Sequence, residues 1–126
     1  MVDGMNVLAS RPDGWWRDRG SARRRLVGEL EDLHRRTGET VVVVFDGHPR
    51  TGEVEDGEAG GVVVRFAGGG PDAADDVIAT LAAGLISPAT TTVVTSDAAL
   101  RRRLAACGVA VMGSGTFRRS IGTQKD

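Results

Sequence analysis

Six aspartates of this sequence stand where a chemical site is easily assembled, beside short apolar runs or at the start of a predicted helix. They are Asp3, Asp46, Asp72, Asp75, Asp76 and Asp97. Three of them, Asp72, Asp75 and Asp76, open the stretch "GGGPDAADDVIATLAAG". Carboxylates so close on one helix repel one another, so the pattern calls for a compensating positive charge. The helix macrodipole is one candidate, and a bound divalent cation is the other.

Four runs of strand length predict buried parallel strands, because they are rich in β-branched and apolar residues and do not alternate with polar ones. They are residues 41–45, 61–67, 91–96 and 108–113. The opening residues 1–2, with residues 6–8 after a turn, predict only the stub of a further strand. Residues 47–61 are polar and Gly-rich, which predicts one long loop.

Helical patterns lie between these runs. Ala22, Leu26, Leu30 and Leu33 form an apolar stripe at helical spacing, and Gly38 is predicted to end that helix. Three more helices are expected over 77–85, 99–106 and 115–121, followed by a disordered tail at 122–126. The alternation predicts a single α/β domain over residues 1–121 with a mostly parallel sheet.

The predicted strands give the aspartates a common position. In open parallel sheets, ligands bind beyond the carboxyl ends of the strands, and Asp3, Asp46 and Asp97 each follow a strand there. A pocket of several carboxylates suits hard cations such as Mg²⁺ or Mn²⁺. Each acid also has a structural interpretation: Asp97 could cap a helix, and Asp75 and Asp76 could serve the helix dipole. The set taken together favours the metal site.

The composition is that of an ordinary globular protein of 126 residues, with 40% hydrophobic and 26% charged residues and a net charge of −1. Cys107 is the single cysteine, so no internal disulfide forms and a cytoplasmic location is expected. No apolar run approaches the roughly 18 residues of a membrane span, and the N-terminus does not resemble a secretory signal. Arginines nevertheless cluster at 23–25, 35–36, 101–103 and 118–119.

Four segments, "VDGMNV", "VVVVFDG", "RFAGGGPDAADDVI" and "VVTSD", occur in an order that resembles the NYN domain, and within it the YacP-like proteins. These form a branch of the PIN-like metal-dependent ribonucleases. The resemblance implies a three-layer α/β/α sandwich around a mostly parallel sheet. It further implies bound Mg²⁺ or Mn²⁺ and endonucleolytic hydrolysis of RNA rather than DNA. Some members of that family cleave messenger RNA in the context of the ribosome.

Carried over residue by residue, the resemblance makes Asp3, Asp75 and Asp97 the catalytic, metal-binding acids, with Asp76 as an additional metal ligand. It gives supporting roles to four further residues. They are Asn6, Asp46, Asp72 and Ser96.

RNA must reach such an acidic pocket along basic or aromatic groups. The candidates are Arg50, Arg101, Arg102, Trp15 and Trp16. The two adjacent tryptophans could stack bases, or one of them could fill the edge of the core.

Other functions of the same architecture fit the residues less well. A receiver domain needs paired acids after its first strand and a lysine after its last, and a haloacid-dehalogenase-type phosphatase needs an acid where Met5 stands. The run "GGGPD" lacks the third glycine of a dinucleotide-binding loop. Two alternatives stay open: a non-catalytic RNA- or ribosome-binding module on the same fold, and a toxin-type PIN ribonuclease.

Overall fold

The structure, a computed structural model, describes residues 1–10, 14, 17–49 and 54–122. Its strands are β1 (Val2–Asp3), β2 (Val41–Phe45), β3 (Gly57–Ala59), β4 (Val62–Phe66), β5 (Thr92–Val94) and β6 (Ala110–Met112). Its α-helices are α1 (Gly4–Ala9), α2 (Arg19–Thr37), α3 (Ala73–Ala83), α4 (Ala98–Leu104) and α5 (Ser114–Gly122). Two 3₁₀ turns, η2 (Pro88–Thr90) and η3 (Ala105–Cys107), complete the described elements.

The strands form one sheet in the order β3-β4-β2-β1-β5-β6, and only β3 runs antiparallel to its neighbour. The two-residue β1 lies at the centre, with Val2 paired to Val43 of β2 and to Val94 of β5. Along the chain, β2 and β4 are added to the sheet on one side of β1, and β5 and β6 are then added on the other side. This reversal beside β1 is the position where open α/β sheets bind ligands at the carboxyl ends of their strands.

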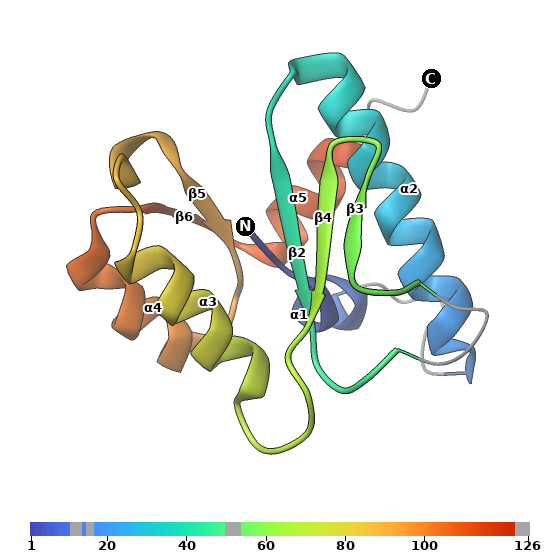
Figure 1. Cartoon of the computed structure of the whole chain (residues 1–126), viewed down its shortest axis with the longest axis horizontal. Coiled ribbons are helices and arrows are strands. Elements are labelled where there is room, and N and C mark those ends of the chain that lie inside the picture. Colours follow the sequence, from blue (N-terminus) through green and yellow to red (C-terminus); the bar gives the residue numbers. More distant parts are fainter. Residues whose placement is uncertain (11–13, 15–16, 50–53, 123–126) are drawn as a thin grey trace.

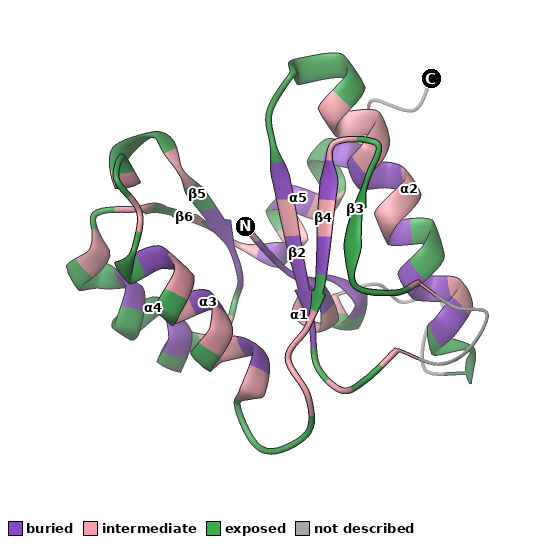
Figure 2. Ribbon diagram, viewed as in Figure 1, coloured by how far each residue is buried: buried purple, intermediate pink, exposed green. Residues whose placement is uncertain are grey.

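Helices cover both faces of the sheet, as the sequence predicts (Figure 1). One core joins α1, α2 and α5 to the sheet and contains Leu8, Leu26 and Phe117. The other joins α3 and α4 to the opposite face and contains Ile78 and Leu100. The burial pattern follows these layers, with buried positions gathered on the strands and on the inner sides of the helices (Figure 2). The α/β/α architecture expected from the sequence is therefore confirmed.

Two elements differ from the expectations. Residues 6–8 belong to α1 rather than to the first strand. The chain turns into a helix directly after Asp3, and this helix buries Val7 and Leu8 fully. Strand β3 lies inside the predicted loop at 47–61. Its residues are all exposed and it is held by its main-chain ladder to β4, so no apolar alternation marks it in the sequence.

None of the helices in the described part of the chain has the length and apolar character needed to cross a membrane.

Candidate metal centre

Five of the six aspartates line one open hollow of about 290 Å³ at the carboxyl ends of β1, β2 and β5. They are Asp3, Asp46, Asp72, Asp75 and Asp97. Among the residues that the structure describes, the others that line it are Met5, Asn6 and Ala9, all from α1. The structure therefore brings together side chains that lie up to 94 positions apart in the sequence, because parallel strands deliver their following residues to the same edge of the sheet.

Asp3 is the buried member of the group, with 5% of its surface exposed. Its Oδ2 accepts a hydrogen bond of 3.0 Å from the hydroxyl of Thr95, which is itself fully buried. Burial raises the pKa of Asp3 from 3.8 to about 6; the Asp75 and Asp46 carboxylates add to the rise, and hydrogen bonds from the Thr95 hydroxyl and the Asn6 backbone oppose it. Asp3 is thus a carboxylate whose negative charge is poorly compensated by the described protein groups around it.

Asp97 is tied to Asp3 through Thr95. The Thr95 hydroxyl accepts the backbone N–H of Asp97 at 3.1 Å while it donates to Asp3. Asp97 is also the N-cap of α4, because its Oδ1 accepts the N–H of Leu100 at 2.9 Å. Asp97 can therefore cap α4 with one carboxylate oxygen while its other oxygen remains available to a ligand in the hollow.

Asp75 lies in the first turn of α3 and is half-buried. Its pKa is raised, first by burial and then by the carboxylates of Asp97, Asp72 and Asp46, while Arg103 acts in the opposite direction. The start of its helix is unusual. Asp72, the N-cap residue, has a left-handed backbone (φ 60°) and makes no side-chain cap. Asp46 takes over instead, with its Oδ1 accepting the N–H of Ala74 at 3.0 Å.

Asp76 lies outside the group that lines the hollow. Its exposed carboxylate accepts a hydrogen bond of 2.7 Å from the guanidinium of Arg103 on α4. In the structure this acid, which the sequence predicts to be a metal ligand, thus forms a surface ion pair between α3 and α4.

Asn6 and Ser96, which the sequence analysis expects to support the site, belong to a small polar network. The Asn6 Oδ1 accepts the backbone N–H of Ser96 at 2.8 Å and the hydroxyl of Ser114 at 2.5 Å. The Ser96 hydroxyl in turn accepts the backbone N–H of Ser114 at 2.8 Å. Sequence reasoning missed Ser114, because a serine at the start of a helix ordinarily indicates no more than a cap.

The residues expected to bind RNA are placed only in part. Arg101 and Arg102 are exposed on α4, the helix that Asp97 caps. Arg50, Trp15 and Trp16 lie outside the described residues.

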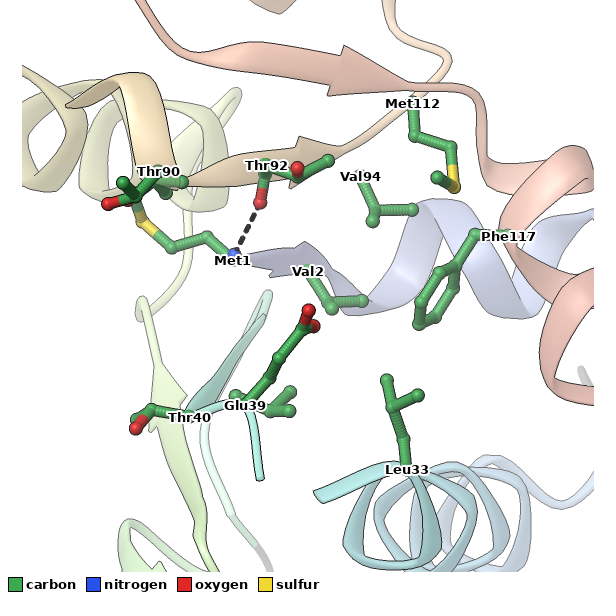
Figure 3. A pocket seen from close by; sticks show the side chains of 12 residues that line it. Met1, Val2, Leu33, Glu39, Thr40, Thr90, Thr92, Val94, Met112 and Phe117 are labelled. Carbon is green, nitrogen blue, oxygen red and sulfur yellow. Dashed lines mark hydrogen bonds between the residues drawn. The ribbon is translucent and has the colours of Figure 1, made fainter. Parts of the chain in front are cut away.

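A larger cavity, of about 500 Å³, lies at the opposite, amino-terminal ends of β1, β2 and β5. Figure 3 shows Met1, whose ammonium group donates to the Thr92 carbonyl at 2.8 Å, together with Leu33 and Phe117 on the cavity wall. Glu39 is the one acid among its lining residues within the described ranges. This cavity is larger than the acidic hollow but is a poorer candidate for binding a divalent cation, which needs several oxygen ligands.

The donor set of the acidic hollow matches the chemistry of Mg²⁺ or Mn²⁺, which prefer carboxylate and carbonyl oxygens. As they stand, no three His, Cys, Asp or Glu side chains within the described ranges come close enough together to hold a metal ion. The residues present fit a hard cation in the chemistry of their donor atoms, and holding one requires their carboxylates to lie closer together than they do in this structure.

The family model for the YacP-like NYN domain matches residues 1–126. The chain is also similar to two crystal structures of Rae1 (YacP) from Bacillus subtilis. Its similarity to the W164L mutant has a TM-score of 0.77 at 27% identity and covers 97% of this chain and 73% of that one. For the other Rae1 structure the TM-score is 0.73 at 27% identity, with coverage of 97% and 72%. No curated protein sequence matches the chain. The likeness extends to the PIN-like fold that the sequence analysis expects.

Proposed function

The chain belongs to the family of YacP-like NYN domains, and on this premise we propose that it is an endoribonuclease that depends on Mg²⁺ or Mn²⁺. Family membership supports a nuclease-type function related to RNA. The metal dependence and the endonucleolytic cut are our proposal: the first is argued from the acidic hollow, and the second from the resemblance to the YacP-like family.

The convergence of Asp3, Asp75 and Asp97 on one hollow carries the proposal. Asp3 ends β1, Asp75 lies in α3, and Asp97 precedes α4 in the segment that follows β5. Burial together with neighbouring carboxylates raises the pKa of both Asp3 and Asp75, so ionising them has a free-energy cost in the metal-free protein. Such a cost is typical of sites that receive a positively charged partner.

The chain's own residues have distinct tasks in this proposal. Asp3, Asp75 and Asp97 hold the cation. Thr95 keeps Asp3 and Asp97 in register through its hydroxyl. When bound, the cation lowers the pKa of a water molecule and stabilises negative charge on the phosphodiester.

RNA is the proposed substrate, with messenger RNA in the ribosome as a specific context. The exposed Arg101 and Arg102 follow Asp97 along α4, which supports a role in contacting phosphates beside the hollow. A net charge of −1 offers little long-range attraction for RNA, so local arginines or a partner must supply it.

The test is cleavage of a 5′-labelled single-stranded RNA by the purified protein, with Mg²⁺, with Mn²⁺ and with EDTA, in the absence and presence of ribosomes. We expect cleavage with metal only, leaving 5′-phosphate ends. Asp97→Asn should remove most activity without loss of folding, because asparagine caps a helix about as well as aspartate.

Asp56→Asn is the matched control. Asp56 also accepts a backbone N–H, that of Phe66, but it does not line the acidic hollow. Activity that persists in EDTA, or that survives Asp97→Asn as fully as Asp56→Asn, would contradict the proposal. Metal binding without cleavage under every condition would favour an RNA- or ribosome-binding module instead.

A further inference from the structure

The side chain of Asn6 is held in one orientation by two donors from distant parts of the chain. Its Oδ1 accepts the N–H of Ser96 at 2.8 Å and the hydroxyl of Ser114 at 2.5 Å. An asparagine amide has an oxygen that accepts and an NH₂ group that donates. A flip of the amide would place the NH₂ group against the backbone N–H of Ser96, so that hydrogen bond would be lost, and the Ser114 hydroxyl would have to change from donor to acceptor.

This arrangement leaves the NH₂ group of Asn6 on the side away from Ser96 and Ser114. Asn6 lines the acidic hollow, where the other polar side chains among the described lining residues are the five aspartates. Ionised carboxylates only accept hydrogen bonds, and the side chains of Met5 and Ala9 offer no donor. Among these described lining residues, the Asn6 amide is therefore the side chain that can donate a hydrogen bond. It is suited to a negatively charged oxygen, which the neighbouring carboxylates would repel.

Ser114 is well placed to fix this orientation. It is 1% exposed and is the first residue of α5, and its backbone N–H is held by the Ser96 hydroxyl at 2.8 Å. A closed ring of three hydrogen bonds therefore joins α1, the end of β5 and the start of α5. Burial already immobilises the Ser114 side chain, so its hydrogen bond to Asn6 costs little further side-chain entropy.

We propose that Ser114 is a positioning residue, which orients Asn6 so that its NH₂ group donates a hydrogen bond to a phosphoryl oxygen of the RNA backbone. This inference rests on the proposed nuclease function and adds to it a residue that does not itself touch the substrate. Because Ser114 acts through Asn6, its loss should lower the rate of the chemical step and leave metal binding unchanged.

The first test is kinetic. Ser114→Ala should lower kcat for the labelled RNA by about five- to tenfold, the effect of losing one hydrogen bond, with little change in KM. Ser114→Thr, which keeps the hydroxyl, should restore much of the rate. Thr116→Ala is the matched control on the same helix, since the Thr116 hydroxyl accepts from Arg119 on the exposed side.

Asn6→Asp tests the NH₂ group without disturbing the ring, because aspartate oxygens still accept from Ser96 and Ser114. We expect folding to be retained and kcat to fall at least as far as in Ser114→Ala, with saturating Mn²⁺ present throughout. In the double variant Ser114→Ala/Asn6→Asp, the two losses should not add, since both remove the same oriented donor.

A readout independent of activity separates this inference from the proposed function. In NMR relaxation measurements, the side-chain NH₂ group of Asn6 should be as rigid as the backbone in the wild type, and Ser114→Ala should lower its order parameter. If the wild type cleaves RNA but Ser114→Ala matches it in kcat and in this order parameter, the inference is overturned while the function stands. If the wild type cleaves nothing, the function fails, and the NMR comparison still decides whether Ser114 orients Asn6. If Ser114→Ala does not fold, a wild-type rate in Asn6→Asp overturns the inference.

Discussion

At the scale of single residues, the aspartates of the hollow are not equivalent. Asp3 is buried and held by Thr95, Asp97 caps α4, and Asp46 caps α3. Asp76, outside the hollow, pairs with Arg103. Aspartates at similar positions in the sequence thus differ in burial and in partner, and only the structure distinguishes them.

Asp3→Asn should make the metal-free protein more stable at pH 7. Asp3 has a pKa of about 6 in the folded protein against 3.8 ordinarily, so folding takes up a proton between these two pH values. Stability is therefore lost as the pH rises from about 4 to 6, and asparagine abolishes that loss. The difference of about two pKa units corresponds to about 3 kcal/mol at pH 7 and vanishes below about pH 4.

Denaturant unfolding of both proteins in EDTA, at pH 4 and at pH 7, measures this difference. A variant less stable than the wild type at pH 7, or a difference that does not change with pH, would contradict the assigned environment of Asp3. Added Mn²⁺ should stabilise the wild type and not the variant, which reverses their order.

Gly4 has a packing reason to be glycine. A Cβ built there would lie 2.5 Å from the Cδ1 and Cε1 atoms of the Phe45 ring, which is fully buried. Gly4→Ala should therefore destabilise the fold by about 1–3 kcal/mol through overpacking. Gly28→Ala is the control, because a Cβ at Gly28 in α2 meets nothing within 4 Å and should stabilise the helix by roughly 0.5–1 kcal/mol. Equal effects of the two substitutions in thermal unfolding would refute this explanation.

At the scale of elements, α3 depends on a residue from another part of the chain. Asp46 follows β2 and supplies the cap that Asp72 does not make. The helix that presents Asp75 is thus fixed to the same sheet edge that presents Asp3. The position of Asp75 is set by long-range capping as well as by core packing.

Asp46→Ala should destabilise the protein by about 1 kcal/mol, since it removes the hydrogen bond to the N–H of Ala74. Asp46→Asn keeps an oxygen acceptor and should retain most of that stability, although it lacks the charge. Urea unfolding of the two variants distinguishes capping from charge. An equal loss of stability in both would mean that the charge of Asp46, and not its hydrogen bond, holds α3.

Much of this arrangement could be predicted from the sequence. The apolar runs at 41–45 and 61–67 and the stripe of α2 are periodic and long enough to be recognised. Helix α1 has only six residues, and its apolar pair Val7 and Leu8 fits a strand as well as a helix. The exposed β3 has no apolar pattern at all, so its pairing with β4 is visible only in the folded chain.

At the scale of the whole molecule, the site lies where the chain crosses from one core to the other. Strand β1 is central, with the α1–α2–α5 core on one face and the α3–α4 core on the other. Strand order explains why the sequence could predict the gathering of the acids at one edge. In the sequence, only the family resemblance ranks Asp75 above Asp76, and the ion pair of Asp76 with Arg103 of α4 is visible only in the folded chain.

Asp75 and Asp76 offer a direct test of the metal centre, because they are neighbours on one helix and only Asp75 lines the hollow. We would titrate Mn²⁺ calorimetrically into the wild type, Asp75→Asn and Asp76→Asn, two variants that lose the same charge. We expect the wild type to bind Mn²⁺, Asp75→Asn to weaken binding by more than about tenfold, and Asp76→Asn to stay within about threefold of the wild type. Absence of binding by the wild type, or equal losses in the two variants, would contradict a metal centre built on the acids of this hollow.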